Sequence, residues 1–60
     1  MTEARVRELC AVSGSTKPEL AKAIVEDCGC ARGSAYRFIA RAEKAKQITF
    51  NKSHETYFRK

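Results

Sequence analysis

The sequence is poor in the residues that keep chains disordered or hold them in membranes. It has one proline and three glycines among 60 residues, and 43% of its residues are apolar. This composition argues against a disordered chain and is typical of a folded globular domain. No apolar run approaches the ~18 residues that a membrane span needs, and no signal-peptide core follows Met1. We therefore expect a cytoplasmic protein that makes no contact with a membrane.

The chain also has little that could support catalysis. A domain of this length buries only about 60% of its unfolded surface, which leaves no room for an enzyme's cleft beside a core. There is a single histidine, and no carboxylate stands at a telling distance from it along the chain. A nucleophile with its base is therefore not expected. No internal repeat or long linker divides the sequence, so we predict one domain over residues 1–60 that is not an enzyme.

Cysteines are few and odd in number: Cys10, Cys28 and Cys30. An odd count without a secretion signal argues against a disulfide framework and favours reduced thiols. Together with His54 they would make a Cys3His set, which suits tetrahedral zinc. The Cys-x-Cys spacing is unusual for zinc, however, and the apolar pattern already gives Cys28 and Cys30 core positions. We expect buried thiols, with zinc as the minor alternative, and no cofactor.

Three stretches have the apolar spacing of amphipathic helices. The first covers residues 2–12, with Thr2 as its cap, and Ser13-Gly14-Ser15 forms a connection after it. The second opens with the capping box Thr16-Lys17-Pro18-Glu19 and ends at Gly29, where a left-handed residue is needed. The third runs from about Arg32 to Ala45. The predicted helical core consists of Val6, Leu9, Cys10, Leu20, Ala21, Ile24, Val25, Cys28, Ala35, Ile39 and Ala42.

Past Lys46 the apolar period changes from 3.6 to 2, which predicts strands. Gln47-Ile48-Thr49-Phe50 places Ile48 and Phe50 on one face. Asn51-Lys52-Ser53-His54 has turn chemistry, and residues 55–59 predict a returning strand rich in β-formers. Because an isolated hairpin is not stable in water, this one must pack its apolar face on the helices. The predicted fold is mostly α, with three helices and a small β-hairpin.

Charge is distributed unevenly along the chain. Residues 1–30 contain four Lys or Arg and five Asp or Glu, a net charge of −1, whereas residues 31–60 contain eight and two, a net charge of +6. A basic helix that follows a tight turn suits the major groove of DNA, which is wide enough for a helix and lined by phosphates. The alternative is an ordinary solvated surface.

The order helix, helix, turn, helix, hairpin over residues 16–59 resembles a winged helix-turn-helix. The stretch Gly29-Cys30-Ala31-Arg32-Gly33-Ser34-Ala35-Tyr36-Arg37-Phe38-Ile39 is similar to the turn and recognition helix of many bacterial and phage regulators. Residues 36–50 also look like the small winged domain of some plasmid and phage replication ATPases. One departure is Ala31, which stands where the family usually has a Ser or Thr cap. Either that cap is poor or the helix starts later, at Ser34.

The resemblance implies that the third helix enters the major groove of double-stranded DNA. Its outward N-terminal residues would then meet base edges, and those further along would touch phosphate. Tyr36 could instead be a half-buried flank, and Gly33 either admits a DNA backbone or reflects helix packing. Lys17 and Lys52, from the second helix and the hairpin tip, are further phosphate candidates. The predicted DNA-binding residues are Arg32, Ser34, Tyr36, Arg37, Arg41, Lys44, Lys17 and Lys52.

The predicted function is sequence-specific binding of double-stranded DNA, as a transcription or replication regulator or as the DNA-binding domain of a larger protein. A single unit makes few contacts, so affinity would come from a homodimer, neighbouring sites or a parent chain. Two other classes remain open. The same fold could dock its third helix on a protein, or bind RNA if Tyr57 or Phe58 were exposed for base stacking.

Overall fold

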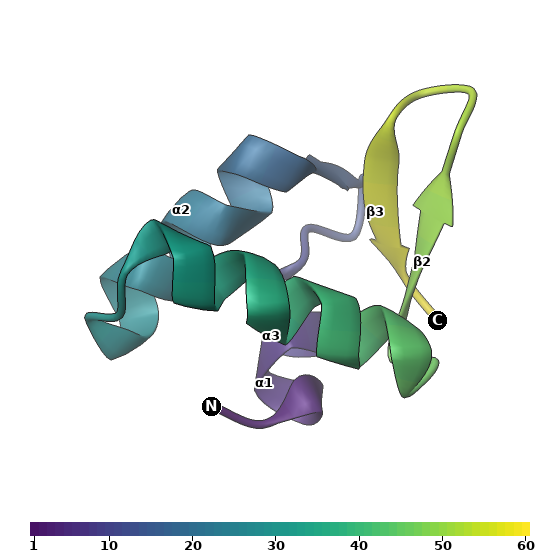
Figure 1. Cartoon of the computed structure of the whole chain (residues 1–60). Coiled ribbons are helices and arrows are strands. Elements are labelled where there is room, and N and C mark those ends of the chain that lie inside the picture. Colours follow the sequence, from purple (N-terminus) through teal and green to yellow (C-terminus); the bar gives the residue numbers. More distant parts are fainter.

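The computed structural model describes all 60 residues, in three helices and three short strands (Figure 1). The strands form one antiparallel sheet in the order β1-β3-β2, so β3 lies in the middle. The predicted mostly-α fold with three helices and a β-hairpin is therefore confirmed. The elements in chain order are α1 (Glu3–Leu9), β1 (Ser15–Thr16), α2 (Lys17–Cys28), α3 (Arg32–Lys44), β2 (Ile48–Asn51) and β3 (Thr56–Arg59).

The helix α2 has the predicted signals at both ends. The Thr16 hydroxyl accepts a hydrogen bond from the Glu19 N–H at 3.4 Å, and a Glu19 carboxylate oxygen accepts one from the Thr16 N–H at 3.0 Å. At the other end Gly29 is left-handed, with φ of 70°, and its N–H donates to the Val25 carbonyl. The capping box and the glycine C-cap thus fix where α2 begins and ends.

The helix α3 begins at Arg32, one residue after Ala31, which takes the N-cap position without a side-chain hydrogen bond. The poor cap predicted at Ala31 is confirmed, and a later start at Ser34 is wrong. The helix α1 is shorter than predicted, because it ends at Leu9 rather than residue 12. Arg59 explains where it stops: its guanidinium donates to the carbonyls of Glu8 and Cys10, both at 2.7 Å.

The strand β1 lies where the sequence predicted only a connection. Ser15 pairs with Tyr57 and Thr16 with Thr56, which adds a third strand to the hairpin. Gly14 lets the chain enter this strand, since its φ is +100° and an added Cβ would lie 2.7 Å from the Phe58 ring. A two-residue strand contains no alternation from which it could be predicted.

The hairpin differs slightly from its predicted boundaries: β2 begins and ends one residue later than predicted, so that it includes Asn51, and β3 begins one residue later. Phe50 faces Tyr57 across the strands, with the ring centroids 4.9 Å apart. The Asn51 side chain accepts hydrogen bonds from the N–H groups of Ser53 and His54, which closes the turn. The predicted turn chemistry is thus confirmed, with the tip exposed to solvent.

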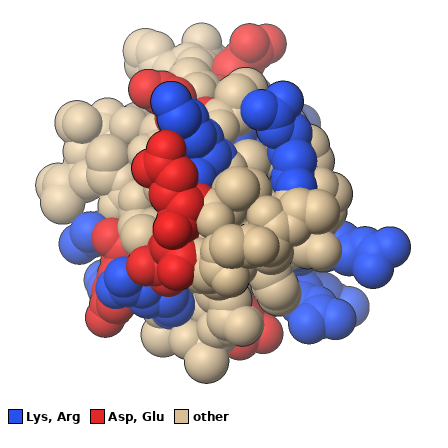
Figure 2. Space-filling model, turned by 90° about the vertical axis from the view of Figure 1, so that its left-hand side faces the viewer, with Lys and Arg blue, Asp and Glu red and all other residues tan.

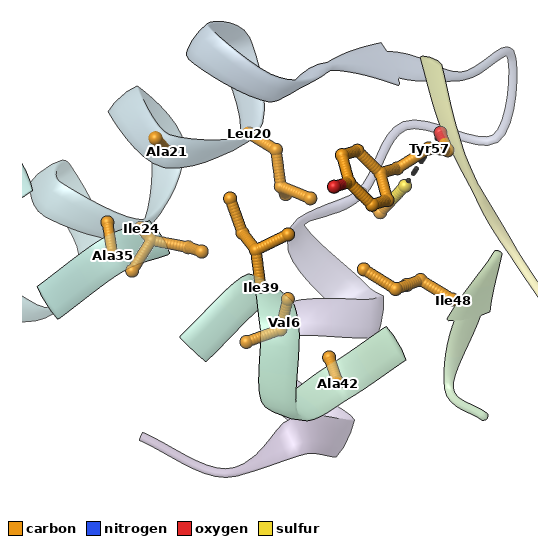
Figure 3. Packing of buried hydrophobic residues seen from close by; sticks show 10 residues of the cluster. Val6, Leu20, Ala21, Ile24, Ala35, Ile39, Ala42, Ile48 and Tyr57 are labelled. Carbon is orange, nitrogen blue, oxygen red and sulfur yellow. Dashed lines mark hydrogen bonds between the residues drawn. The ribbon is translucent and has the colours of Figure 1, made fainter. Parts of the chain in front are cut away.

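The core joins all three helices to the sheet (Figure 3). Ile39 of α3 lies between Val6 of α1 and Leu20 of α2, while Ile48 and Tyr57 close the cluster from the hairpin. The apolar face of the hairpin thus packs on the helices, as predicted. The ten buried apolar residues are Val6, Cys10, Leu20, Ala21, Ile24, Ala35, Ile39, Ala42, Ile48 and Tyr57.

One predicted core position is wrong, and several others are only half-buried. Cys28 is exposed, because it is the last residue of α2 and only the turn follows it. Phe50, on the edge strand β2, is half-buried and packs against the core cluster beside Tyr57. Leu9, Val25 and Cys30 are also half-buried, and they pack against the edge of the cluster. Apolar spacing therefore located the core correctly but extended it too far at the ends of elements.

Candidate nucleic-acid interface

The helix α3 has two faces of opposite character. Ala35, Ile39 and Ala42 are buried, and they lie on one side at helical spacing. At 100° per residue, Arg37 and Lys44 lie opposite this buried stripe and Arg41 lies beside them. All three are exposed. The packed face fixes the orientation of the helix, so the basic face is held outward.

None of the basic residues after the turn is neutralised by an acidic partner. The protein has two ion pairs, and both use Arg5, which joins Glu8 and Asp27. The eight Lys and Arg of residues 31–60 form none. Figure 2 displays the consequence: Lys and Arg atoms project from its right-hand edge, the side on which α3 lies, with no Asp or Glu atoms among them. This surface is therefore available to an anionic partner.

Gly33 lies near the start of the outer face, and nothing in the fold requires a glycine there. An added Cβ would meet no atom within 4 Å, and the residue has no positive φ. Helix packing within the domain therefore does not explain it. A glycine in a helix lowers stability by up to about 1 kcal/mol relative to alanine. Four residues before Arg37, Gly33 lies next to it on the outer face of the helix.

Lys17 and Tyr36 lie together rather than on the outer face of α3. The Lys17 ammonium is 5.1 Å from the centroid of the Tyr36 ring, a cation–π contact between the start of α2 and α3. Tyr36 is half-buried and packs against the core cluster. Of its two predicted roles, the structure favours the flank.

The other predicted residues divide between the helix start and the hairpin tip. Arg32 is exposed at the first position of α3, and Ser34 is half-buried on the flank of the helix. Lys52 is exposed at the tip of the hairpin between β2 and β3, and so does not belong to the basic face of α3. The structure thus gathers Arg37, Arg41 and Lys44 on one face and leaves Lys52 on a separate projection (Figure 1).

A groove of about 650 Å³ separates the start of α2 from the hairpin. The carboxylate of Glu19 already holds the amide and hydroxyl of Thr16 here, and these hydrogen bonds lower the pKa of Glu19. The N-terminus of α2 would therefore bind an anion more weakly than the N-terminus of an uncapped helix. The groove is lined by Thr16, Lys17, Pro18, Phe50, His54, Glu55 and Tyr57.

Sequence reasoning missed Lys46 as a candidate. It is exposed, follows α3 directly, and has a φ of 63°. Its position continues the basic run that ends at Lys44, so the charge pattern alone could have included it. In contrast, Arg59 is not free for such a contact, because its guanidinium is held by the carbonyls at the end of α1.

The thiols do not assemble with His54. No three of the chain's His, Cys, Asp and Glu side chains come together as a metal site requires. Cys10 lies in the core, where its thiol donates to the Tyr57 carbonyl at 3.2 Å, drawn as the dashed line in Figure 3. Cys28 and Cys30 lie instead at the turn between α2 and α3.

Comparison with known proteins does not place the chain in a family. No protein-family model matches it, and no curated protein or solved structure is significantly similar to it. None of its three helices has both the length and the apolar character needed to cross a membrane. The function must therefore be argued from the chain's own geometry and charge.

Proposed function

We propose that the protein binds double-stranded DNA through α3, in the manner of a winged helix-turn-helix domain. The observation that carries the proposal is the outer face of α3. It presents Arg37, Arg41 and Lys44 without a neutralising carboxylate, on a helix whose other face is locked into the core. A rigid basic helix of this kind matches the width and charge of the major groove.

Within this proposal the residues of α3 have different roles. Arg37 and Arg32, nearest the helix start, meet base edges, since the guanidinium fork suits the O6 and N7 acceptors of guanine. Arg41 and Lys44, one and two turns further along, contact phosphates. Tyr36 and Ser34 support the helix from its flanks, and Lys52 adds a contact from the hairpin tip. The binding is noncovalent and uses no cofactor.

The proposed cellular role is that of a transcription or replication regulator in the cytoplasm, or of the DNA-binding domain of a larger protein. One unit of this size offers few contacts. Specific binding therefore requires a second unit, as a homodimer or within a parent chain, which doubles the number of contacts.

The alternatives gain no supporting observation. A protein groove would call for an apolar stripe on α3, but the exposed large apolar residues are Met1 and Val12, in other parts of the chain. RNA recognition was tied to exposed aromatics on the hairpin, yet Tyr57 is only 7% exposed and Phe58 is half-buried.

The decisive experiment is a titration against duplex DNA, single-stranded DNA and RNA at several salt concentrations. The expected result is preference for duplex, with a log–log slope of about −0.9 for each phosphate neutralised. A salt-independent affinity, absent duplex binding in dilute buffer, or a clear preference for RNA would contradict the proposal.

A further inference from the structure

The turn between α2 and α3 holds two thiols that neither the core nor the basic face uses. Cys28 is the last residue of α2 and is exposed, and Cys30 is half-buried two residues later. Only Gly29 separates them. The third thiol, Cys10, lies elsewhere, buried in the core.

The backbone of the turn keeps the two cysteines close together. Gly29 has φ of 70° and ψ of 19°, the left-handed helical conformation. This geometry bends two successive 3.8 Å Cα steps, which puts the Cα atoms of Cys28 and Cys30 roughly 5–6 Å apart. Disulfides form when Cα atoms lie about 4.4–6.8 Å apart, so the pair is within range.

The two thiols also influence one another electrostatically. The neighbouring Cys28 raises the pKa of Cys30, and desolvation adds to the rise. Cys30 therefore keeps its proton to higher pH while the more exposed Cys28 meets solvent. The surroundings are open, since a Cβ added to Gly29 would meet no atom within 4 Å. A small oxidant can reach this site.

We propose that Cys28 and Cys30 form a redox-active dithiol, which a hydroperoxide closes into a disulfide that reshapes the turn from which α3 starts. The Cys28 thiolate attacks one peroxide oxygen, which breaks the O–O bond, leaves a sulfenic acid on Cys28 and releases an alcohol or water. The Cys30 sulfur then attacks the sulfenic sulfur. The S–S bond forms, and the departing hydroxide takes the Cys30 proton to leave as water.

Closure affects α3 because the two thiols lie directly before its first residue, Arg32. Ala31 provides no side-chain cap, and the backbone bond that closes the turn runs from the Gly29 N–H to the Val25 carbonyl at 2.8 Å. The Cα spacing already suits a disulfide, so drawing the two sulfurs to a bond length of about 2 Å changes the turn by adjusting the backbone torsions on both sides of Gly29. Arg32, only two residues beyond Cys30, moves with it.

The test treats the reduced protein with hydrogen peroxide and maps its cysteines by mass spectrometry. We expect an intramolecular Cys28–Cys30 disulfide that a dithiol reductant reopens, with Cys10 untouched. Cys30→Ser should stop at a Cys28 sulfenic acid that a 1,3-dione traps, and Cys28→Ser should form no intramolecular disulfide. A covalent dimer, a bond to Cys10, or no disulfide in the wild type would overturn the proposal.

Two further measurements report what disulfide formation does to the turn and to DNA binding. Amide NMR shifts at Gly29 and Arg32 should move on oxidation, and unchanged shifts in the closed form would also contradict the proposal. The effect on DNA rests on the proposed function: oxidation should weaken duplex binding severalfold in the wild type and not in Cys30→Ser. If the reduced protein does not bind duplex, the proposed function fails, but the mass spectra and NMR shifts still test whether Cys28 and Cys30 form a redox-active dithiol.

Discussion

The two halves of the chain use the same basic residue types in opposite ways. In residues 1–30, Arg5 joins Glu8 and Asp27, and Arg7 donates twice to the Lys60 carbonyl. In residues 31–60, Arg37 and Arg41 form neither an ion pair nor a side-chain hydrogen bond, and both are exposed. A guanidinium that ties two elements together is part of the fold. One that the fold holds outward without a partner is available for binding.

The comparison has one exception in each half, and both are informative. Arg59 belongs to the basic half, yet it donates to two carbonyls at the end of α1. Lys22 belongs to the other half, yet it is exposed and forms no ion pair. Position in the sequence therefore predicts net charge correctly but does not decide whether a given charge is used within the fold.

The largest effect is expected from the hairpin's inner residue. Ile48→Ala should lower the free energy of unfolding by about 2–5 kcal/mol, because it removes a fully buried side chain and leaves a cavity. In a domain of marginal stability this approaches the whole free energy of unfolding. Phe50→Ala is the control and should lose less than a fully buried Phe would, since Phe50 is half-buried. Urea unfolding of both variants measures the difference, and equal losses would contradict the packing of the hairpin.

The next prediction tests the basic half directly. If the proposed function holds, Arg37→Ala should weaken binding to a specific duplex site by about 1–3 kcal/mol and relax the base preference, because it removes the proposed bidentate contact. Its unfolding should be unchanged. Lys22→Ala is the matched control, since Lys22 is an exposed cation on α2 in the other half. Equal effects of the two variants on affinity would mean that overall charge, and not the face of α3, determines binding.

Arg59, the exception in the basic half, should give the opposite result, a loss of stability without a loss of affinity. Arg59→Ala should lower stability by about 1–3 kcal/mol, because the carbonyls of Glu8 and Cys10 lose charge-assisted hydrogen bonds. Its affinity for duplex should stay close to that of the wild type at equal salt. Thermal unfolding and duplex titration together separate the two roles. A loss of affinity without a loss of stability would instead mean that Arg59 belongs to the DNA-binding surface.

The extent of correct prediction follows from the range of the interactions involved. Local signals, namely the capping box at Thr16 and the left-handed Gly29, fixed α2, and the helical period found most of the core. The strand β1 and the role of Arg59 depend on contacts across more than 40 residues, and nothing near them in the sequence encodes these contacts. Cys28 was misplaced because an apolar period does not reveal where the covering element ends.

The candidate site was predictable to a different extent. The charge contrast alone located Arg37, Arg41 and Lys44, and the helical period predicted their common face. Tyr36 could not be decided from the sequence, because a ring with a polar tip suits both a flank and a binding surface. The absence of ion pairs among the basic residues was also beyond the sequence, since it depends on where every carboxylate lies in the fold.

Gly33 offers a smaller and more selective test. Gly33→Ala should raise stability by up to about 1 kcal/mol, because alanine favours a helix and the added methyl meets no atom of the fold. If α3 approaches DNA closely at this point, the same variant should bind duplex more weakly. For this one variant, an unfolding experiment should thus show a gain in stability and a titration a loss of duplex affinity. Unchanged affinity would mean that the glycine does not lie against DNA.

The smallest expected effect concerns the charges that the N-terminal half uses internally. A hydrogen bond from the Arg5 guanidinium holds the pKa of Asp27 below its usual value of about 4. A group with a lowered pKa contributes its stability above the unfolded pKa and loses it as the pH falls through the folded pKa. Stability should therefore decline below about pH 4. Asp27→Asn should reduce this acid dependence while leaving duplex binding at neutral pH unchanged. An acid transition of the same size in the variant would mean that the Arg5–Asp27 pair, exposed as it is, contributes nothing to the fold.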